Sequence, residues 1–243
     1  MLGWMARRVL GQYDLLLATD DESADAGADG VVYYVGPNIL ATEKRFAFPP
    51  GEFRLWLALH ELTHRSQFTG VPWLRPHFLS LVGELVEAVE PDVDRIRAGL
   101  RNLISERRAG RDPLAEGGLA AVFATERQRC LIDQVGGMMS LVEGHGDATM
   151  ARAAQGHVPS AERFHTVMHH RRTTSRPLAR LLQRLMGIEA KLLQYQAGEE
   201  FIAAIEADRG ARAVDRIWED VEFLPTLAEI RDPAAWMARV PAA

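Results

Sequence analysis

The stretch His60-Glu61-Leu62-Thr63-His64 places two imidazoles four residues apart, with a carboxylate directly after the first. Residues four apart on an α-helix lie on the same face, so both imidazoles can reach one metal ion. Zinc binds imidazole nitrogen readily, prefers tetrahedral sites, and in catalytic sites keeps one position for water. Glu61 is then placed to accept the proton of that water. The pattern predicts a helix that carries a catalytic zinc site.

The residues around this motif favour a buried helix. Pro49-Pro50-Gly51 is a suitable start, because proline is tolerated in the first turn. Steps of three and four connect Phe53, Trp56, Leu57, His60 and His64, and other faces carry Leu55, Leu59 and Leu62. We expect the helix to end at Gly70 and to be buried on nearly all sides. Such burial also permits a second interpretation, in which the histidines are core residues bonded to carbonyl groups.

Composition is that of an ordinary globular protein. The 243 residues are 47% hydrophobic and 25% charged, which provides ample apolar material for a core. A net charge of −5 argues against a nucleic-acid-binding surface, and the single cysteine, Cys130, excludes an internal disulfide framework. No apolar run approaches the roughly 20 residues of a membrane span, and the first residues lack the charge order of a signal peptide. We expect a cytoplasmic protein that binds neither nucleic acid nor membranes.

Periodicity predicts a mainly α chain with one small β element near the N-terminus. A short helix is expected over residues 3–17, with an apolar run at 15–17 that can pair with a strand at Val31–Val35. Gly36-Pro37-Asn38 is expected to be a turn. Further helices are expected over residues 77–90, 92–109, 117–128, 129–155 (one helix or two joined at glycines), 161–186 with a break near 175–177, 188–208, 211–219 and 233–239.

The domain organisation follows from the same pattern. No stretch is rich enough in glycine, proline and serine to be a linker. We therefore expect residues 1–243 to form a single domain, in which residues 1–47 are a small α/β portion. Residues 48–243 are expected to be the helical metal-binding core.

A zinc site needs a third protein ligand, and the best candidate lies about 80 residues after the motif. On a helix, Glu143 and Asp147 share one stripe with Met139 and Met150. Glu143 can reach the metal, while Asp147 can accept a hydrogen bond from the free ring nitrogen of a ligand histidine. Four glycines weaken this segment by about 1 kcal/mol each, which suggests close approach to another helix. These are Gly136, Gly137, Gly144 and Gly146.

Other interpretations of the third ligand remain open. His145 points to the opposite side of an unbroken helix from Glu143, yet it can replace it as ligand. If the glycines break the helix, His145 can instead donate a proton in the transition state. Glu84 is a rival ligand, although it lies on a polar stripe typical of a solvated face. Glu143 and Asp147 can also be a solvated acidic pair.

Two further histidines also lie one helical turn apart. His165 and His169 permit a second metal site, but no carboxylate stands beside them in the sequence. Arg171 and Arg172 follow closely, so a solvated basic face is the favoured interpretation.

Several short elements together resemble one family. They are Gly3-Trp4-Met5, Val9-Leu10-Gly11-Gln12-Tyr13-Asp14, Pro37-Asn38-Ile39, the HExxH motif with Gln67-Phe68, Glu143-Gly144-His145, and Lys191 with Gln194-Tyr195. Over nearly the whole chain, the sequence resembles the zincin-like hydrolases associated with biosynthesis of the deazaflavin coenzyme. The resemblance implies a mainly helical zincin-like domain with zinc-dependent hydrolase or peptidase chemistry. The Glu143–Asp147 pairing also resembles the gluzincin arrangement, although its distance from His64 is much longer.

We therefore expect a zinc-dependent, metallopeptidase-like hydrolase that acts on a peptide or amide bond. The expected Zn²⁺ ligands are His60, His64 and Glu143. Glu61 and His145 are the expected catalytic residues, and Asp147 is expected to orient a ligand histidine. The alternative is a catalytically silent zincin-fold scaffold or binding protein associated with deazaflavin coenzyme biosynthesis. The sequence indicates neither the substrate nor the oligomeric state.

Overall fold

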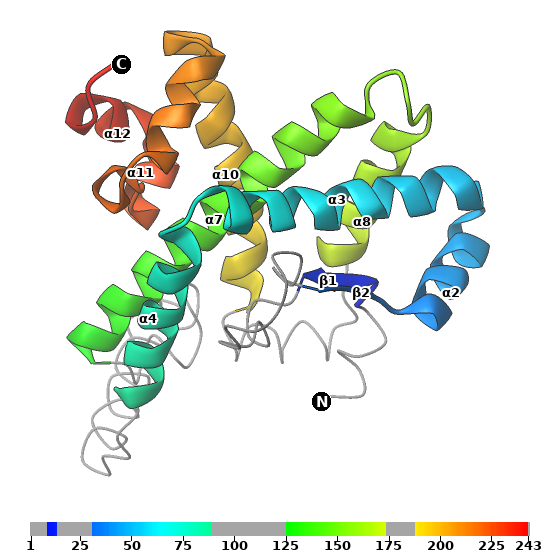
Figure 1. Ribbon diagram of the computed structural model, residues 1–243, viewed down its shortest axis with the longest axis horizontal. Coiled ribbons are helices and arrows are strands. Elements are labelled where there is room, and N and C mark those ends of the chain that lie inside the picture. Colours follow the sequence, from blue (N-terminus) through cyan, green and yellow to red (C-terminus); the bar gives the residue numbers. More distant parts are fainter. Residues whose placement is uncertain (1–8, 14–30, 89–124, 174–187, 243) are drawn as a thin grey trace, which may run out of the picture. The chain divides into compact units, whose positions relative to one another are not determined.

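The structure is a computed structural model of the 243-residue chain that describes residues 9–13, 31–88, 125–173 and 188–242. Within these ranges the protein is mainly helical with one small sheet near the N-terminus, which confirms the predicted fold class (Figure 1). None of the helices in these ranges is both long and apolar enough to span a membrane. The chain forms two compact units: Met1–Arg75 with His145–His169, and Pro76–Gly144 with His170–Ala243.

In the first unit, the helix that carries the histidine motif is α3, Pro50–Gly70. It begins at the predicted prolines, and Glu52 in its first turn interacts favourably with the helix dipole. Leu55 is 45% exposed and Leu62 is 47% exposed. The expectation of burial on nearly all sides was therefore wrong, because only one side of α3 packs against the core while its outer face meets solvent.

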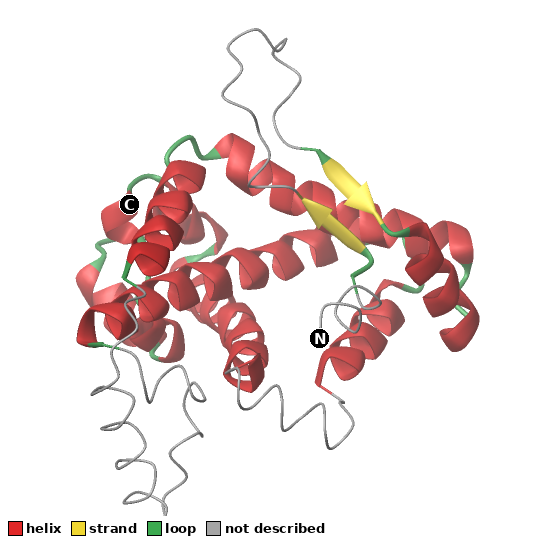
Figure 2. Cartoon of the chain, turned by 90° about the horizontal axis from the view of Figure 1, so that it is seen from below, coloured by secondary structure: helices red, strands yellow, loops and turns green. Residues whose placement is uncertain are grey.

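The small sheet pairs β1, Gly11–Tyr13, with β2, Val32–Tyr34, in antiparallel register (Figure 2). The second strand was predicted. Its partner β1 lies where a short helix over residues 3–17 was expected, so that expectation was wrong at Gly11–Tyr13, and the expected run at 15–17 lies outside the described residues. Helix α2, Gly36–Phe46, begins where a turn was expected, because Pro37 is well suited to the first turn of a helix. Both strands contact α3.

An aromatic core holds α3 in the first unit. Phe48, Phe53, Trp56 and Phe164 pack with ring centroids 4.8–6.1 Å apart. Phe164 comes from α8, Ala161–Thr173, and the end of α7, Glu126–Ala154, adds Met150 and Ala154. Edge-to-face aromatic pairs contribute about 0.5–1.5 kcal/mol beyond the burial of their area. The motif-bearing helix is thus anchored by its first two turns.

The second unit contains most of α7 and the elements near the C-terminus. It also contains nearly all of α4, Leu74–Glu87, which begins at the end of the first unit. The elements near the C-terminus are α10 Ile188–Arg209, the 3₁₀ segments Ala211–Trp218 and Val221–Phe223, α11 Leu227–Arg231 and α12 Pro233–Arg239. Phe201 and Trp236 pack edge to face at 5.6 Å in its core. A capping box at Thr226 and Glu229 begins α11, a short helix that the sequence analysis missed.

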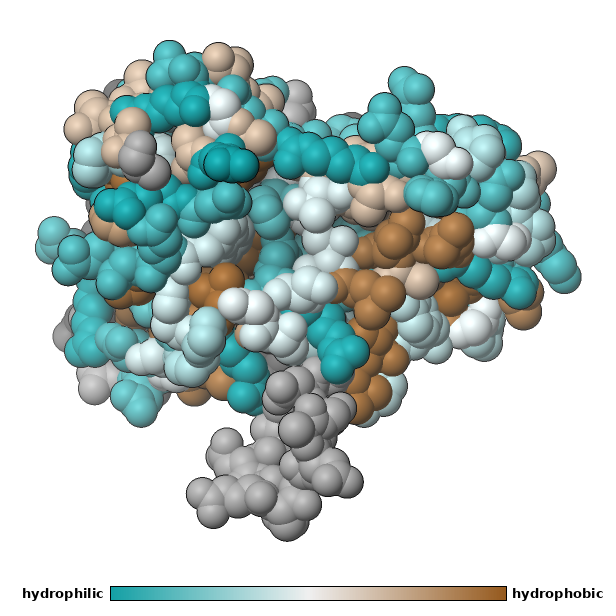
Figure 3. Space-filling view, turned by 45° about the horizontal axis from the view of Figure 1, so that its top comes forward, coloured by the Kyte–Doolittle hydropathy of each residue, from teal (hydrophilic) through white to brown (hydrophobic). Residues whose placement is uncertain are grey.

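The other predicted helices have different outcomes. Residues 129–155 form one unbroken helix, and the expected segments at 77–90, 188–208 and 233–239 are confirmed within a few residues. The helix at 92–109, residues 117–124 of the helix expected at 117–128, and the break near 175–177 lie outside the described residues. The face shown in Figure 3 is mostly hydrophilic or intermediate in colour, with hydrophobic residues gathered right of centre and smaller hydrophobic areas elsewhere.

Candidate metal centre

Helix α3 positions both histidines of the motif and the carboxylate between them. The ring centroids of His60 and His64 are 4.7 Å apart, and the ring of His60 stacks on Trp56 at 6.2 Å. Because Trp56 belongs to the aromatic core, it restricts the orientation of the first imidazole. Glu61 is only 6% exposed. The four-residue spacing thus produces the paired imidazoles that the sequence predicts.

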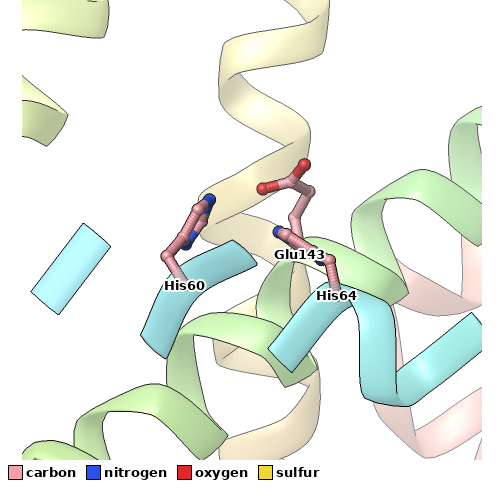
Figure 4. Close-up of side chains that lie close together, drawn as sticks. All are labelled: His60, His64 and Glu143. Atoms are coloured by element: carbon pink, nitrogen blue, oxygen red, sulfur yellow. The ribbon is translucent and has the colours of Figure 1, made fainter. Parts of the chain in front are cut away.

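Glu143 supplies a carboxylate beside these imidazoles. It lies on α7, one turn before Asp147 and without a break between them, so the helix itself fixes its position. One ligand atom from each of His60, His64 and Glu143 lies within 4.8 Å of the others, and all three side chains are partly buried. Figure 4 shows the three side chains directed toward one another.

The chemistry of this donor set fits a zinc ion. Two imidazole nitrogens and one carboxylate oxygen are the ligands found in hydrolytic zinc sites, which leave a fourth position for water. Zinc–ligand bonds of roughly 2.1 Å place the ligand atoms of a tetrahedral site about 3.4 Å apart. The three candidate ligand atoms lie within 4.8 Å of one another, so modest side-chain movements would bring them to zinc-binding distances. His60, His64 and Glu143 can therefore hold the metal.

Asp147 lies close to His60, as the prediction of a supporting carboxylate requires. Its Oδ1 is 3.9 Å from Nδ1 of His60, beyond hydrogen-bond length but close enough for electrostatic attraction to a ring N–H. Asp147 also has a carboxylate oxygen within 4.8 Å of a ring nitrogen of His165. The sequence showed no carboxylate beside His165 because the two residues are far apart along the chain.

Gln67 is a site residue whose role the sequence analysis missed. It is buried, and its Oε1 lies 3.0 Å from Nδ1 of His64. Its Nε2 lies 3.0 Å from Nδ1 of His145, whose Nε2 is 3.5 Å from the hydroxyl of Thr149. The available signal was the spacing, because a residue three positions after His64 lies on the same side of the helix.

Strand β1 covers Glu61. A Cβ atom built on Gly11 lies 2.5 Å from Oε1 of Glu61, so only glycine fits here without displacing the carboxylate. Tyr34 is paired with Gly11 in the ladder, and paired residues project from the same face of a sheet. Burial, and secondarily the charge of Glu61, raises the pKa of Tyr34. Tyr34 is thus an aromatic group near the Glu61 carboxylate that was not among the predicted site residues.

The rival ligands have other partners. Glu84 is 44% exposed and forms an ion pair of 3.3 Å with Arg127, as expected for a residue on a solvated face. His145 engages Gln67 and Thr149 as described above. Among the described residues, neither Glu84 nor His145 belongs to a group of three potential metal ligands.

Comparison with known proteins adds two similarities. A family model described as "Zincin-like metallopeptidase" matches residues 1–237. The crystal structure of a "putative hydrolase with a novel fold" from Chloroflexus aurantiacus shares 32% sequence identity and a TM-score of 0.65. The alignment covers 98% of this chain but 65% of that one, so the chain spans less than two thirds of the solved protein. No curated protein matches the chain.

Proposed function

Because the chain belongs to the zincin-like metallopeptidase family, we propose that it is a zinc-dependent hydrolase that cleaves a peptide or amide bond. The family implies a metal ion, usually zinc. The observation that carries the proposal is that one ligand atom each from His60, His64 and Glu143 lies within 4.8 Å of the others, on a helix whose next residue after His60, Glu61, is buried. The similarity of this chain to the solved "putative hydrolase" from Chloroflexus aurantiacus supports the same class of reaction.

Each residue has a distinct role in this proposal. Zinc bound by His60, His64 and Glu143 would polarise the substrate carbonyl and lower the pKa of an attacking water. Glu61 takes the proton of the water at a carboxylate oxygen and then delivers it to the leaving nitrogen. Asp147 stabilises the orientation of His60 through the proton on Nδ1. The bonds from His145 to Gln67 and Thr149 favour a supporting role over the predicted role of proton donor.

The setting of the reaction follows from the sequence. We propose a peptide or amide substrate, a cytoplasmic location, and no binding of nucleic acid or membranes, in keeping with the composition. An association with deazaflavin coenzyme biosynthesis is supported by the sequence resemblance. The nature of the bond cleaved rests on the general chemistry of sites with two histidines and one glutamate.

One observation favours the second candidate, a catalytically silent zincin-fold scaffold. Strand β1 lies directly against Glu61, and Gly11 approaches its carboxylate closely. A scaffold would keep the metal for stability while this strand excludes a substrate. The two candidates differ in turnover and not in metal content.

Replacement of Glu61 by glutamine distinguishes them. The zinc-loaded protein is incubated with an internally quenched peptide library, and Glu84→Gln serves as the matched control because Glu84 is solvent-exposed and paired with Arg127. We expect the Glu61→Gln protein to keep its metal and to lose cleavage by roughly 10²–10⁴-fold, the contribution of a general base. Cleavage at the wild-type rate by Glu61→Gln would refute the mechanism, and absence of cleavage by the wild type would favour the scaffold.

A further inference from the structure

A chain of polar contacts joins α7 to the second histidine of the motif. It runs from Thr149 to His145 at 3.5 Å, from His145 to Gln67 at 3.0 Å, and from Gln67 to His64 at 3.0 Å. All four residues belong to the first unit, and Gln67 at the centre is buried. Unpaired amide groups are costly inside a protein, so the two ends of the Gln67 amide are held by their partners.

The chemistry of the amide sets the proton positions along this chain. A carbonyl oxygen can only accept, so Nδ1 of His64 carries the proton that it donates to Oε1 of Gln67. The amide nitrogen can only donate, so Nδ1 of His145 accepts from Nε2 of Gln67. In this tautomer the lone pair of the His64 ring lies on Nε2, which can then serve as the metal-binding nitrogen.

The backbone of α7 restrains the same imidazole from a second side. A Cβ atom built on Gly146 lies 3.1 Å from Cε1 of His64 and 3.8 Å from Nε2 of Gln67. Glycine thus lets α7 approach closely enough for its neighbour His145 to reach Gln67. The ring of His64 is bounded by α7 and held at Nδ1 by the amide.

We propose that Gln67 is a positioning residue that fixes the tautomer and orientation of His64 as a metal ligand, with His145 holding the amide of Gln67 in the required orientation. The proposal rests on the proposed zinc-binding function. Gln67 would thus support His64 as Asp147 supports His60. The proposal also explains why His145 adjoins the ligand Glu143 without joining the ligand set.

The test measures zinc affinity by competition with a chromogenic chelator on the full chain. Loss of an outer hydrogen bond to a ligand histidine weakens metal binding by about 10–100-fold, which we expect for Gln67→Leu. In Gln67→Glu the carboxylate still accepts from Nδ1 of His64, and its two equivalent oxygens need no orientation by His145, whose other tautomer presents Nδ1–H to the second oxygen. We therefore expect affinity within about threefold of the wild type. A residue that serves packing alone gives the opposite order, because leucine suits a buried site better than a charge.

A double-mutant cycle tests the role of His145. His145→Leu should weaken zinc binding, and its effect should largely disappear in the Gln67→Leu background, because both act on His64 through one amide. Circular dichroism and thermal unfolding of the metal-free variants report folding independently of zinc. If Gln67→Leu misfolds, the Gln67→Glu protein still decides, since loss of affinity in that folded variant overturns the proposal.

The outcomes separate the inference from the function on which it rests. A wild-type protein that binds no zinc refutes the proposed function and the inference together. A wild-type protein that binds zinc, with Gln67→Leu equal to it in affinity, overturns only the role of Gln67 and leaves the hydrolase proposal standing.

Discussion

The contact between Gly144 of α7 and Gly198 of α10 gives a prediction whose magnitude follows from the structure. A Cβ atom built on Gly144 lies 2.2 Å from the carbonyl carbon of Gly198 and 2.5 Å from the nitrogen of Glu199. One built on Gly198 lies 2.0 Å from the carbonyl oxygen of Ser140. Carbon atoms pack at about 3.5–4.0 Å, so Gly144→Ala must separate the helices by roughly 1.5 Å.

Two opposing terms set the expected stability of Gly144→Ala. Alanine favours the helix over glycine by about 1 kcal/mol. Overpacking costs typically 1–3 kcal/mol, and the upper end applies here because the obstacle is backbone, which cannot change rotamer. We expect a net loss of about 2 kcal/mol, which lowers the melting temperature of a chain of this size by roughly 4–8 °C.

Thermal and urea unfolding of the metal-free protein measure this loss. Gly83→Ala is the matched control, because Gly83 is also inside a helix of the second unit and a Cβ there has no neighbour within 4 Å. The control should be as stable as the wild type or more stable by up to about 1 kcal/mol. Equal stability of the two alanine variants would refute the close packing of α7 against α10.

Two further substitutions test other contacts. Gly11→Ala should displace the Glu61 carboxylate by close to 1 Å and lower kcat about 100-fold with zinc affinity unchanged, while Gly51→Ala, with open space around it, should leave both unchanged. Burial alone would raise the pKa of Glu229, but hydrogen bonds including those from Arg239 lower it overall. The contribution of ionised Glu229 to the stability of the folded protein is therefore complete above the ordinary glutamate pKa of about 4.3. It is lost as the pH falls through the lower pKa that Glu229 has in the folded protein. Glu229→Gln should cost about 1–3 kcal/mol at pH 7 in urea unfolding, and an equal cost at pH 3 would contradict this explanation.

Local patterns explain what the sequence could predict. The bounds of α3 follow from Pro50 at its start and from apolar residues repeating at three- and four-residue steps, all within the 21 residues of the helix itself. The stripe that joins Glu143 to Asp147 is likewise a property of one helix, so their shared face needs no tertiary information. These local features account for the predicted fold class and for the choice of candidate ligands.

Contacts between distant segments explain what the sequence could not predict. Gly11-Gln12-Tyr13 lacks the β-branched residues typical of a strand, and its position is set by the close approach of Gly11 to Glu61. The contact between Gln67 and His145 joins residues 78 apart. The exposure of Leu62 depends on what packs against α3, which periodicity alone does not show.

The zinc content of the purified protein tests the central proposal most directly. Elemental analysis is applied to the wild type, Glu143→Gln and Glu84→Gln, all purified without chelator and checked for folding by circular dichroism. The proposed site predicts one zinc per chain in the wild type and in Glu84→Gln, and loss of most of that zinc in Glu143→Gln. A wild type without zinc, or a Glu143→Gln protein that retains it fully, would contradict the proposed metal centre.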